Sequence, residues 1–366
     1  MLKRTPVVPL IFGFVFVFAI TLVENATAQT HFPKLTWQNS GTTEGLIAVS
    51  PVNARVVWAA GRHGTFLRTV DGGKTWTSGQ VKNSKFLQFR DVQGVSDKVA
   101  YLQSIGNNPG DFRIYKTEDG GATWALQFKN DLIGAFYDCF AFWTPKHAIS
   151  HSDSVNGIFP DIRTTDGATW QSISSNMPPA LPGEASFAAS GTCVATQGEN
   201  NAWIATGGAS QARILATTDG ADTWNAYDTP LVSSGSAGAF TVDFRDAANG
   251  LVGGGDLDPS DPDNARTAIS SDGGQTWKFT NAPPVTGAIF GLSYVRHVTP
   301  CNTKLCQDTT RYVVVTANSG GAAWSPDEGT TWYVLPGVTG GWAVAFASPK
   351  AGWLVGTNGT IVKISF

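Results

Sequence analysis

Charged residues are scarce in this sequence, and none are gathered into a block. Only 14% of the 366 residues are Asp, Glu, Lys or Arg, and the formal net charge is −3. A nucleic-acid-binding protein needs a clustered basic face, which this charge pattern does not supply. The sequence also has no glycine-rich loop of the kind that follows a strand, opens a helix and holds phosphates. We therefore expect neither a nucleic-acid partner nor a cofactor.

Stretches with helical periodicity are equally rare. Short apolar runs broken by Gly, Asn, Asp and Ser dominate, while glycine is abundant at 41 residues and tryptophan reaches 13. Such runs, bounded by turn-forming residues, are typical of strands. Although the length could hold two average domains, this composition favours one large all-β domain.

Long hydrophobic runs are absent except at the N-terminus. There, Lys3 and Arg4 precede an almost wholly apolar run over residues 7–23, and the small residues Ala26 and Ala28 flank Thr27. This order predicts a secretion signal over residues 1–28, cleaved to leave a single domain over residues 29–366 that is periplasmic or secreted. The alternative is an uncleaved membrane anchor, because the run is near the lower length limit for spanning a bilayer.

Cysteine is limited to four residues. Cys301 and Cys306 bracket the polar segment CNTKLC, which predicts a loop closed by a local disulfide in an oxidising compartment. A metal site would need four ligands at tight spacing, which this segment lacks, so we expect no metal there. Cys139 and Cys193 each lie in a strand-like run, where they either pair with each other or remain buried thiols, because connectivity cannot be read from sequence.

One short motif recurs six times along the chain. The copies are TVDGGKTW (69–76), TEDGGATW (117–124), TTDGATW (164–170), TTDGADTW (217–224), SSDGGQTW (270–277) and SPDEGTTW (325–332). Their aspartates are Asp71, Asp119, Asp166, Asp219, Asp272 and Asp327. The spacing runs from 47 residues, between Asp119 and Asp166, to 55, between Asp272 and Asp327. That period is typical of one four-stranded propeller blade per repeat.

The motif has a local physical logic. An Asp in a turn accepts hydrogen bonds from backbone N–H groups a few residues on, and the glycines that follow permit positive φ. The closing Trp buries apolar surface between blades. Because the motif repeats once per blade, we interpret its carboxylates as structural rather than as catalytic or calcium-binding groups.

The two chain ends together supply one more blade. Residues 341–366 contain three strand-like runs but stop before a Trp-bearing fourth, and residues 35–40, around Trp37, resemble the segment that follows each motif. The N-terminal strand is therefore predicted to complete the last blade. This closes a seven-bladed all-β propeller and removes the exposed sheet edges.

The repeats resemble the Asp-box (BNR-like) motif, and the runs GRHGTFLRTVDGGKTW (61–76) and GWLVGTNGTIVKIS (352–365) are most similar to the photosystem II assembly and stability factor family. That resemblance implies a non-enzymatic extracytoplasmic propeller, which binds a membrane protein under assembly through an arginine-bearing surface. We expect a monomer with a protein partner. The arginines that could form such a surface are Arg62, Arg68, Arg90, Arg113, Arg163, Arg213 and Arg245.

A glycan-active hydrolase or a glycan-binding propeller is the alternative, since the fold hosts both. A sialidase needs an arginine cluster, a Tyr nucleophile with a Glu partner and an acidic residue. Residues of these types are present, among them Tyr137, Glu184, Arg213 and Arg296, but the Arg-Ile-Pro sequence typical of sialidases is absent.

The repeat pattern breaks in the third and fourth blades. Asp138, His151 and Asp153 replace the usual small and apolar residues of the third blade, and Glu184 precedes the inner strand of the fourth. Together with Arg213 these residues are candidates for a ligand-binding site at the central channel. The alternative is a hydrogen-bonded polar core between blades.

A second departure is the acidic loop over residues 253–264. Its four aspartates resemble a calcium-binding loop, but the glutamate that closes a helix-loop-helix calcium site is missing. We interpret the segment as a solvated loop.

Overall fold

The computed structural model describes residues 1–2, 32–258, 266–295, 312–317 and 320–366. Nearly all of the predicted signal segment, the pair Cys301 and Cys306, and part of the acidic loop lie outside these ranges. The chain divides into two units, Met1–Phe32 and Pro33–Phe366, and the fold belongs to the second. Helix in the described residues is limited to the 3-10 turns η1 (Ser174–Asn176) and η3 (Thr357–Gly359), and none of it could cross a membrane.

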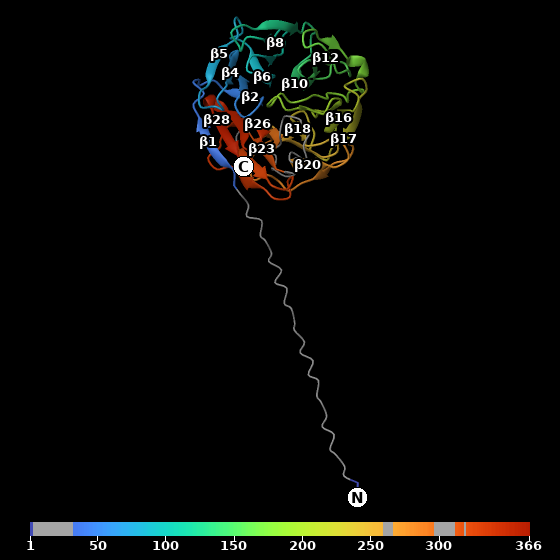
Figure 1. The fold of residues 1–366 in the computed structure, drawn as a ribbon. Coiled ribbons are helices and arrows are strands. Elements are labelled where there is room, and N and C mark those ends of the chain that lie inside the picture. The colour runs from blue at the N-terminus through green and yellow to red at the C-terminus, as the bar shows by residue number, and fades with distance from the viewer. Residues whose placement is uncertain (3–31, 259–265, 296–311, 318–319) are drawn as a thin grey trace. The chain divides into compact units, whose positions relative to one another are not determined.

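The second unit consists of seven four-stranded antiparallel sheets, and each is one propeller blade (Figure 1). Blade 1 consists of β2 (Leu46–Pro51), β3 (Val57–Gly61), β4 (Thr65–Thr69) and β5 (Thr77–Gln80). Blade 2 consists of β6 (Gln88–Gly94), β7 (Ala100–Ile105), β8 (Arg113–Thr117) and β9 (Ala125–Lys129). Blade 3 consists of β10 (Tyr137–Thr144), β11 (His147–Ser152), β12 (Ile162–Thr164) and β13 (Gln171–Ser172). Blade 4 consists of β14 (Val194–Gln197), β15 (Asn201–Ala205), β16 (Arg213–Thr217) and β17 (Asn225–Asp228). Blade 5 consists of β18 (Ala237–Phe244), β19 (Gly250–Asp256), β20 (Thr267–Ser270) and β21 (Lys278–Phe279). Blade 6 is β22 (Ile289–Tyr294), β23 (Val313–Ala317), β24 (Gly321–Ser325) and β25 (Tyr333–Val334), and blade 7 is β26 (Gly341–Ser348), β27 (Ala351–Gly356), β28 (Ile361–Ser365) and β1 (Lys34–Gln38).

The N-terminal strand closes the ring, as the sequence predicts. In Figure 1 the blue strand β1 lies beside the red strand β28. The two pair antiparallel, with Trp37 opposite Val362. The seven-bladed all-β propeller is therefore confirmed.

Aromatic residues of the second strands hold neighbouring blades together. The Trp58 indole donates to the Ser96 carbonyl at 2.8 Å, and the Trp203 indole donates to the Gly273 carbonyl at 2.8 Å. The Tyr101 hydroxyl likewise donates to the Gly167 carbonyl at 2.9 Å. These side chains are at most 1% exposed, so each buries a large apolar surface between blades and also satisfies its polar group.

The six repeated motifs form turns between the third and fourth strands, which we call the repeat turns. In the second, Asp119 Oδ1 accepts the Thr117 hydroxyl at 2.9 Å and the Thr123 N–H at 2.9 Å. Gly121, with φ of 91°, donates its N–H to the Thr117 hydroxyl at 2.9 Å. The other five aspartates accept the same two kinds of bond, from the preceding Ser or Thr hydroxyl and from a following Thr N–H.

Replacing Asp119 with asparagine should make stability less dependent on pH in acid. Hydrogen bonds from the Thr123 hydroxyl and N–H lower the pKa of Asp119 from 3.8 to about 2. A pKa lowered by folding stabilises the protein above pH 3.8, and this contribution is lost as the pH falls toward 2. At pH 6 we expect the urea midpoint of unfolding to be higher for wild type than for Asp119→Asn. The difference between the two midpoints should become smaller as the pH approaches 2. A gap that is equal at the two pH values would contradict this role for the carboxylate.

Candidate functional site

The inner strand of blade 4 departs from those of the other blades. The inner strands of the other six blades each contain a register shift near their start. In blade 4, Ala185 pairs with Gly207, and the ladder resumes only where the Cys193 carbonyl accepts the Ala205 N–H at 2.8 Å. The intervening residues, 187–192, leave the sheet, and we call them the crossing segment.

The crossing segment contacts three other blades. The Ala188 carbonyl accepts a hydrogen bond from Arg90 at 2.6 Å, and Ser190 donates to the Phe290 carbonyl at 2.5 Å. The Thr192 hydroxyl lies 2.7 Å from that of Thr241. Because these partners belong to the inner strands of blades 2, 6 and 5, the segment reaches across the centre of the ring.

Arg90, which binds this segment, has a second arginine near it. The guanidinium carbon of Arg90 is 4.9 Å from the centre of the Trp342 ring, and its Nε has no hydrogen-bond partner among the described residues. Burial, together with the charge of Arg62, lowers the pKa of Arg90 to about 10. Arg62 is exposed. The centre of the ring therefore carries two neighbouring positive charges next to an aromatic ring.

Glu184 and Arg213 form a buried ion pair. Arg213 Nε donates to Glu184 Oε1 at 2.9 Å, and its second nitrogen, Nη2, contacts Glu184 Oε2. The Thr206 hydroxyl and the Leu181 N–H also donate to the Glu184 carboxylate, at 2.7 and 2.8 Å. The pair fixes the long connection from β13 to β14, which leads into the crossing segment.

The carboxyls of Asp138 and Asp153 lie side by side. Burial first, and the charge of Asp153 second, raise the pKa of Asp138 well above its ordinary value, and burial also raises that of Asp153. The Ser186 N–H donates to Asp153 Oδ1 at 2.9 Å. Within the described residues the Asp138 oxygens have no other donor, which is consistent with one proton shared between the two carboxyls.

His151 pairs with an aspartate that the sequence analysis did not select. Its Nδ1 lies 2.9 Å from Asp161 Oδ2, and both side chains are fully buried. Asp161 stands five residues before the aspartate of its repeat turn, where the other copies place Phe66, Ile114, Ile214, Thr267 and Ala322. The acidic residue at this position was the sequence feature that could have identified the partner of His151.

The five candidate residues thus form three separate contacts, Asp138 with Asp153, His151 with Asp161, and Glu184 with Arg213. The first and last are connected, because the Ser154 N–H donates to the Glu184 carbonyl at 3.2 Å. This arrangement fits the polar-core alternative and positions the crossing segment.

Cys139 and Cys193 are bonded as a disulfide between the inner strands of blades 3 and 4. The alternative of two buried thiols is therefore excluded. The bond lies directly after the crossing segment and anchors its C-terminal end.

The described residues give little support to glycoside hydrolysis. Asp138 and Glu184 are each 1% exposed, and the Tyr137 hydroxyl donates to the Pro160 carbonyl at 2.7 Å. No group of acidic, His or Cys side chains within the described ranges could hold a metal ion. Arg296 and the aspartates Asp261 and Asp263 lie outside these ranges.

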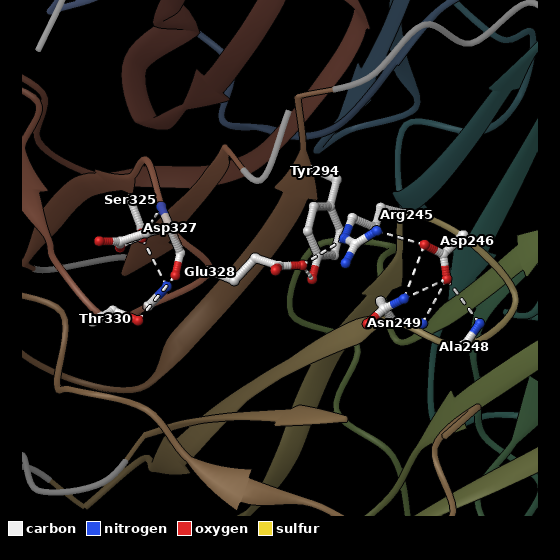
Figure 2. Close-up of polar contacts among 10 residues, drawn as sticks. Arg245, Asp246, Ala248, Asn249, Tyr294, Ser325, Asp327, Glu328 and Thr330 are labelled. Carbon is white, nitrogen blue, oxygen red and sulfur yellow. Dashed lines mark hydrogen bonds and ion pairs between the residues drawn. The ribbon is translucent and has the colours of Figure 1, made fainter. Parts of the chain in front are cut away.

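A tyrosine and a glutamate do meet between blades 5 and 6 (Figure 2). Glu328, which stands where other repeat turns have glycine, accepts the Tyr294 hydroxyl at 3.0 Å and Arg245 Nε at 2.7 Å. Tyr294 is 1% exposed and Glu328 is 6% exposed. Because a glycan could not reach these atoms, the cluster joins two blades rather than forming an active site.

Most of the arginines proposed as a partner-binding surface are bonded within the fold. Arg68 donates to the Asp97 carbonyl, Arg163 to the Gly220 carbonyl, and Arg113 to the Gly110 carbonyl. Of the seven, Arg62 alone makes no side-chain hydrogen bond or ion pair within the described residues. It is therefore the arginine most available to a partner.

Comparison with protein-family profiles and with curated protein sequences finds no match for the chain. Solved structures do match along nearly its whole length. A structure of YCF48 bound to a D1 peptide has a TM-score of 0.62 at 16% identity, covering 92% of this chain and 97% of that one. YCF48 from Cyanidioschyzon merolae has a TM-score of 0.59 at 15% identity, covering 90% of this chain and 98% of that one. The WD40 propeller domain of Doa1 gives 0.55 at 10% identity, with coverages of 91% and 97%. At such identities the likeness shows the fold, which is that of a YCF48-like propeller.

Proposed function

We propose that the protein is an extracytoplasmic binding module, which holds a polypeptide segment of a membrane protein during its assembly and has no enzymatic activity. The observation that carries the proposal is the whole-length match to a YCF48 propeller in complex with a D1 peptide. The sequence resemblance to photosystem II assembly factors supports the same class of function.

The centre of the ring offers a chemistry suited to such a segment. Arg62 is exposed, and Arg90, which is partly buried, adds a second positive charge near it. Guanidinium groups bind carboxylates through paired hydrogen bonds. A segment with an acidic side chain or a terminal carboxylate would match this positive charge.

The compartment is part of the proposal. A basic, apolar and small-residue order at the N-terminus is typical of exported proteins. The disulfide between Cys139 and Cys193 supports an oxidising compartment, because such bonds are rare in the cytosol.

Reversing the charge of Arg62 should reduce partner capture by at least about tenfold, the equivalent of about 1.4 kcal/mol. The tagged protein would be expressed in its own host, crosslinked, and recovered after a short pulse of amino-acid label. We expect labelled, newly made membrane proteins to copurify with wild type and to be lost with Arg62→Glu. Arg55→Glu is the matched control, because Arg55 is also exposed and its side chain bonds only the Val70 carbonyl within the described residues.

Two outcomes would contradict the proposed function. One is equal capture by wild type and Arg62→Glu. The other is turnover of glycosidic substrates by the purified protein without any crosslinked membrane protein.

A further inference from the structure

One face of the propeller carries the connections between blades. In an antiparallel four-stranded blade, the connection from the second to the third strand and the connection to the next blade lie on the same face, because the chain reverses at each turn. On blades 1 to 3 these connections include residues 81–87, 106–112, 130–136 and 153–161. The connection at Arg62 lies on this same face.

Three of these connections expose large apolar side chains. Phe86 is 63% exposed, Leu132 49%, Ile133 78% and Ile158 55%. We call these four residues the apolar arc. Single exposed apolar residues are common on protein surfaces, but a group of large ones on adjacent loops marks an interaction surface.

The loops that bear the arc contact one another along the face. The guanidinium carbon of Arg113 lies 5.2 Å from the Phe86 ring, and Arg113 Nε donates to the Gly110 carbonyl at 2.7 Å. The Gly110 N–H in turn donates to the Asn130 carbonyl at 2.7 Å, which leads into the connection that bears Leu132 and Ile133.

The same chain of contacts continues to Ile158. A methyl group built on Gly134 would lie 3.8 Å from the Val155 side chain. Val155 donates its N–H to the Ile158 carbonyl at 2.8 Å. The four apolar side chains therefore belong to loops that contact one another in sequence.

Positive charge accompanies the arc. Lys82 and Lys85 are exposed in the same connection as Phe86 and make no ion pair within the described residues. Lys129 pairs with Asp131 at 3.0 Å, so its charge is locally balanced. Two uncompensated positive charges thus adjoin the arc in a chain whose net charge is −3.

We propose that the apolar arc docks the propeller on the surface of an anionic lipid bilayer. Apolar side chains on separate loop tips can enter the boundary between headgroups and acyl chains, while lysines beside them attract anionic headgroups. Docking by this face would turn the centre of the ring toward the membrane. The inference stands on different residues from the proposed peptide site, so either can fail alone.

Vesicle flotation tests the docking directly. Protein purified from cells that express the full-length gene would be mixed with phosphatidylcholine vesicles, with or without about 30 mol% phosphatidylglycerol. We expect wild type to float with the anionic vesicles, and Phe86→Ser/Ile133→Ser to reduce the bound fraction about tenfold. Lys82→Gln/Lys85→Gln should remove the preference for phosphatidylglycerol.

A matched control separates docking from general loss of surface apolarity. Leu126 and Val334 are 49% and 50% exposed on the outer strands β9 and β25. We expect Leu126→Ser/Val334→Ser to bind vesicles like wild type. The proposal is overturned if this control loses as much binding as Phe86→Ser/Ile133→Ser, or if the latter binds like wild type.

A photocrosslinking amino acid at position 133 identifies what covers the arc in cells. Lipid adducts at position 133, together with none at position 334, would support docking of the apolar arc on a bilayer. Polypeptide adducts in place of lipid would overturn the proposal in favour of a protein partner. Neither result depends on capture through Arg62.

Discussion

Arg213→Met should lower the free energy of unfolding by about 3–5 kcal/mol, the usual loss when one partner of a buried ion pair is removed. The Glu184 side chain is fully buried and that of Arg213 is 11% exposed. Methionine fills most of the arginine volume but offers no donor, so the Glu184 carboxylate keeps only its bonds from Thr206 and Leu181. A buried charge with too few donors is costly, because water no longer solvates it. Urea unfolding followed by tryptophan fluorescence measures the loss.

A second variant identifies the source of that loss. Because Glu184→Gln removes the charge that Arg213 balances, Arg213→Met/Glu184→Gln should recover part of the stability lost in Arg213→Met. Lys129→Met is the control, since Lys129 and Asp131 are 45% and 75% exposed and such pairs contribute about 0–1 kcal/mol. An Arg213→Met loss no larger than that of Lys129→Met would contradict the structural role of the pair.

The sequence predicts the blades because the interactions that define them are local. In the second repeat turn, Asp119 bonds to residues two positions before and four positions after it. Such spacing repeats visibly along a chain. The strand around Trp37 is also recognisable, because it resembles the segments that follow the other turns and pairs in register with β28.

The crossing segment could not be predicted, because its bonds connect residues that are distant in sequence. Arg90 and Ala188 are 98 positions apart, and Ser190 and Phe290 are 100 apart. Its own residues, FAASGT, are mostly small and show no motif. The sequence did point to the third and fourth blades as irregular, but it could not show that their polar residues pair with one another.

Loss of the disulfide between Cys139 and Cys193 should lower the free energy of unfolding by about 4 kcal/mol, the value expected for a bond that closes a loop of 54 residues. Wild type unfolded in urea with and without reductant provides the first comparison. Cys139→Ala/Cys193→Ala provides the second, and it also includes the cost of removing two buried sulfur atoms. The reduced wild type keeps both sulfurs, so it isolates the effect of the crosslink.

The position of the bond explains why its effect should also be local. Inner strand β14 has only four residues, whereas its neighbours β10 and β18 have eight each, because the crossing segment takes the place of its first part. The shorter strand has fewer ladder bonds to β15 in its own blade, and the disulfide ties the first residue after the segment to blade 3. Amide exchange in the reduced protein should therefore rise first at residues 187–193. Equal protection there in oxidised and reduced protein, or a stability difference below about 1 kcal/mol, would show that the blades hold the segment without the bond.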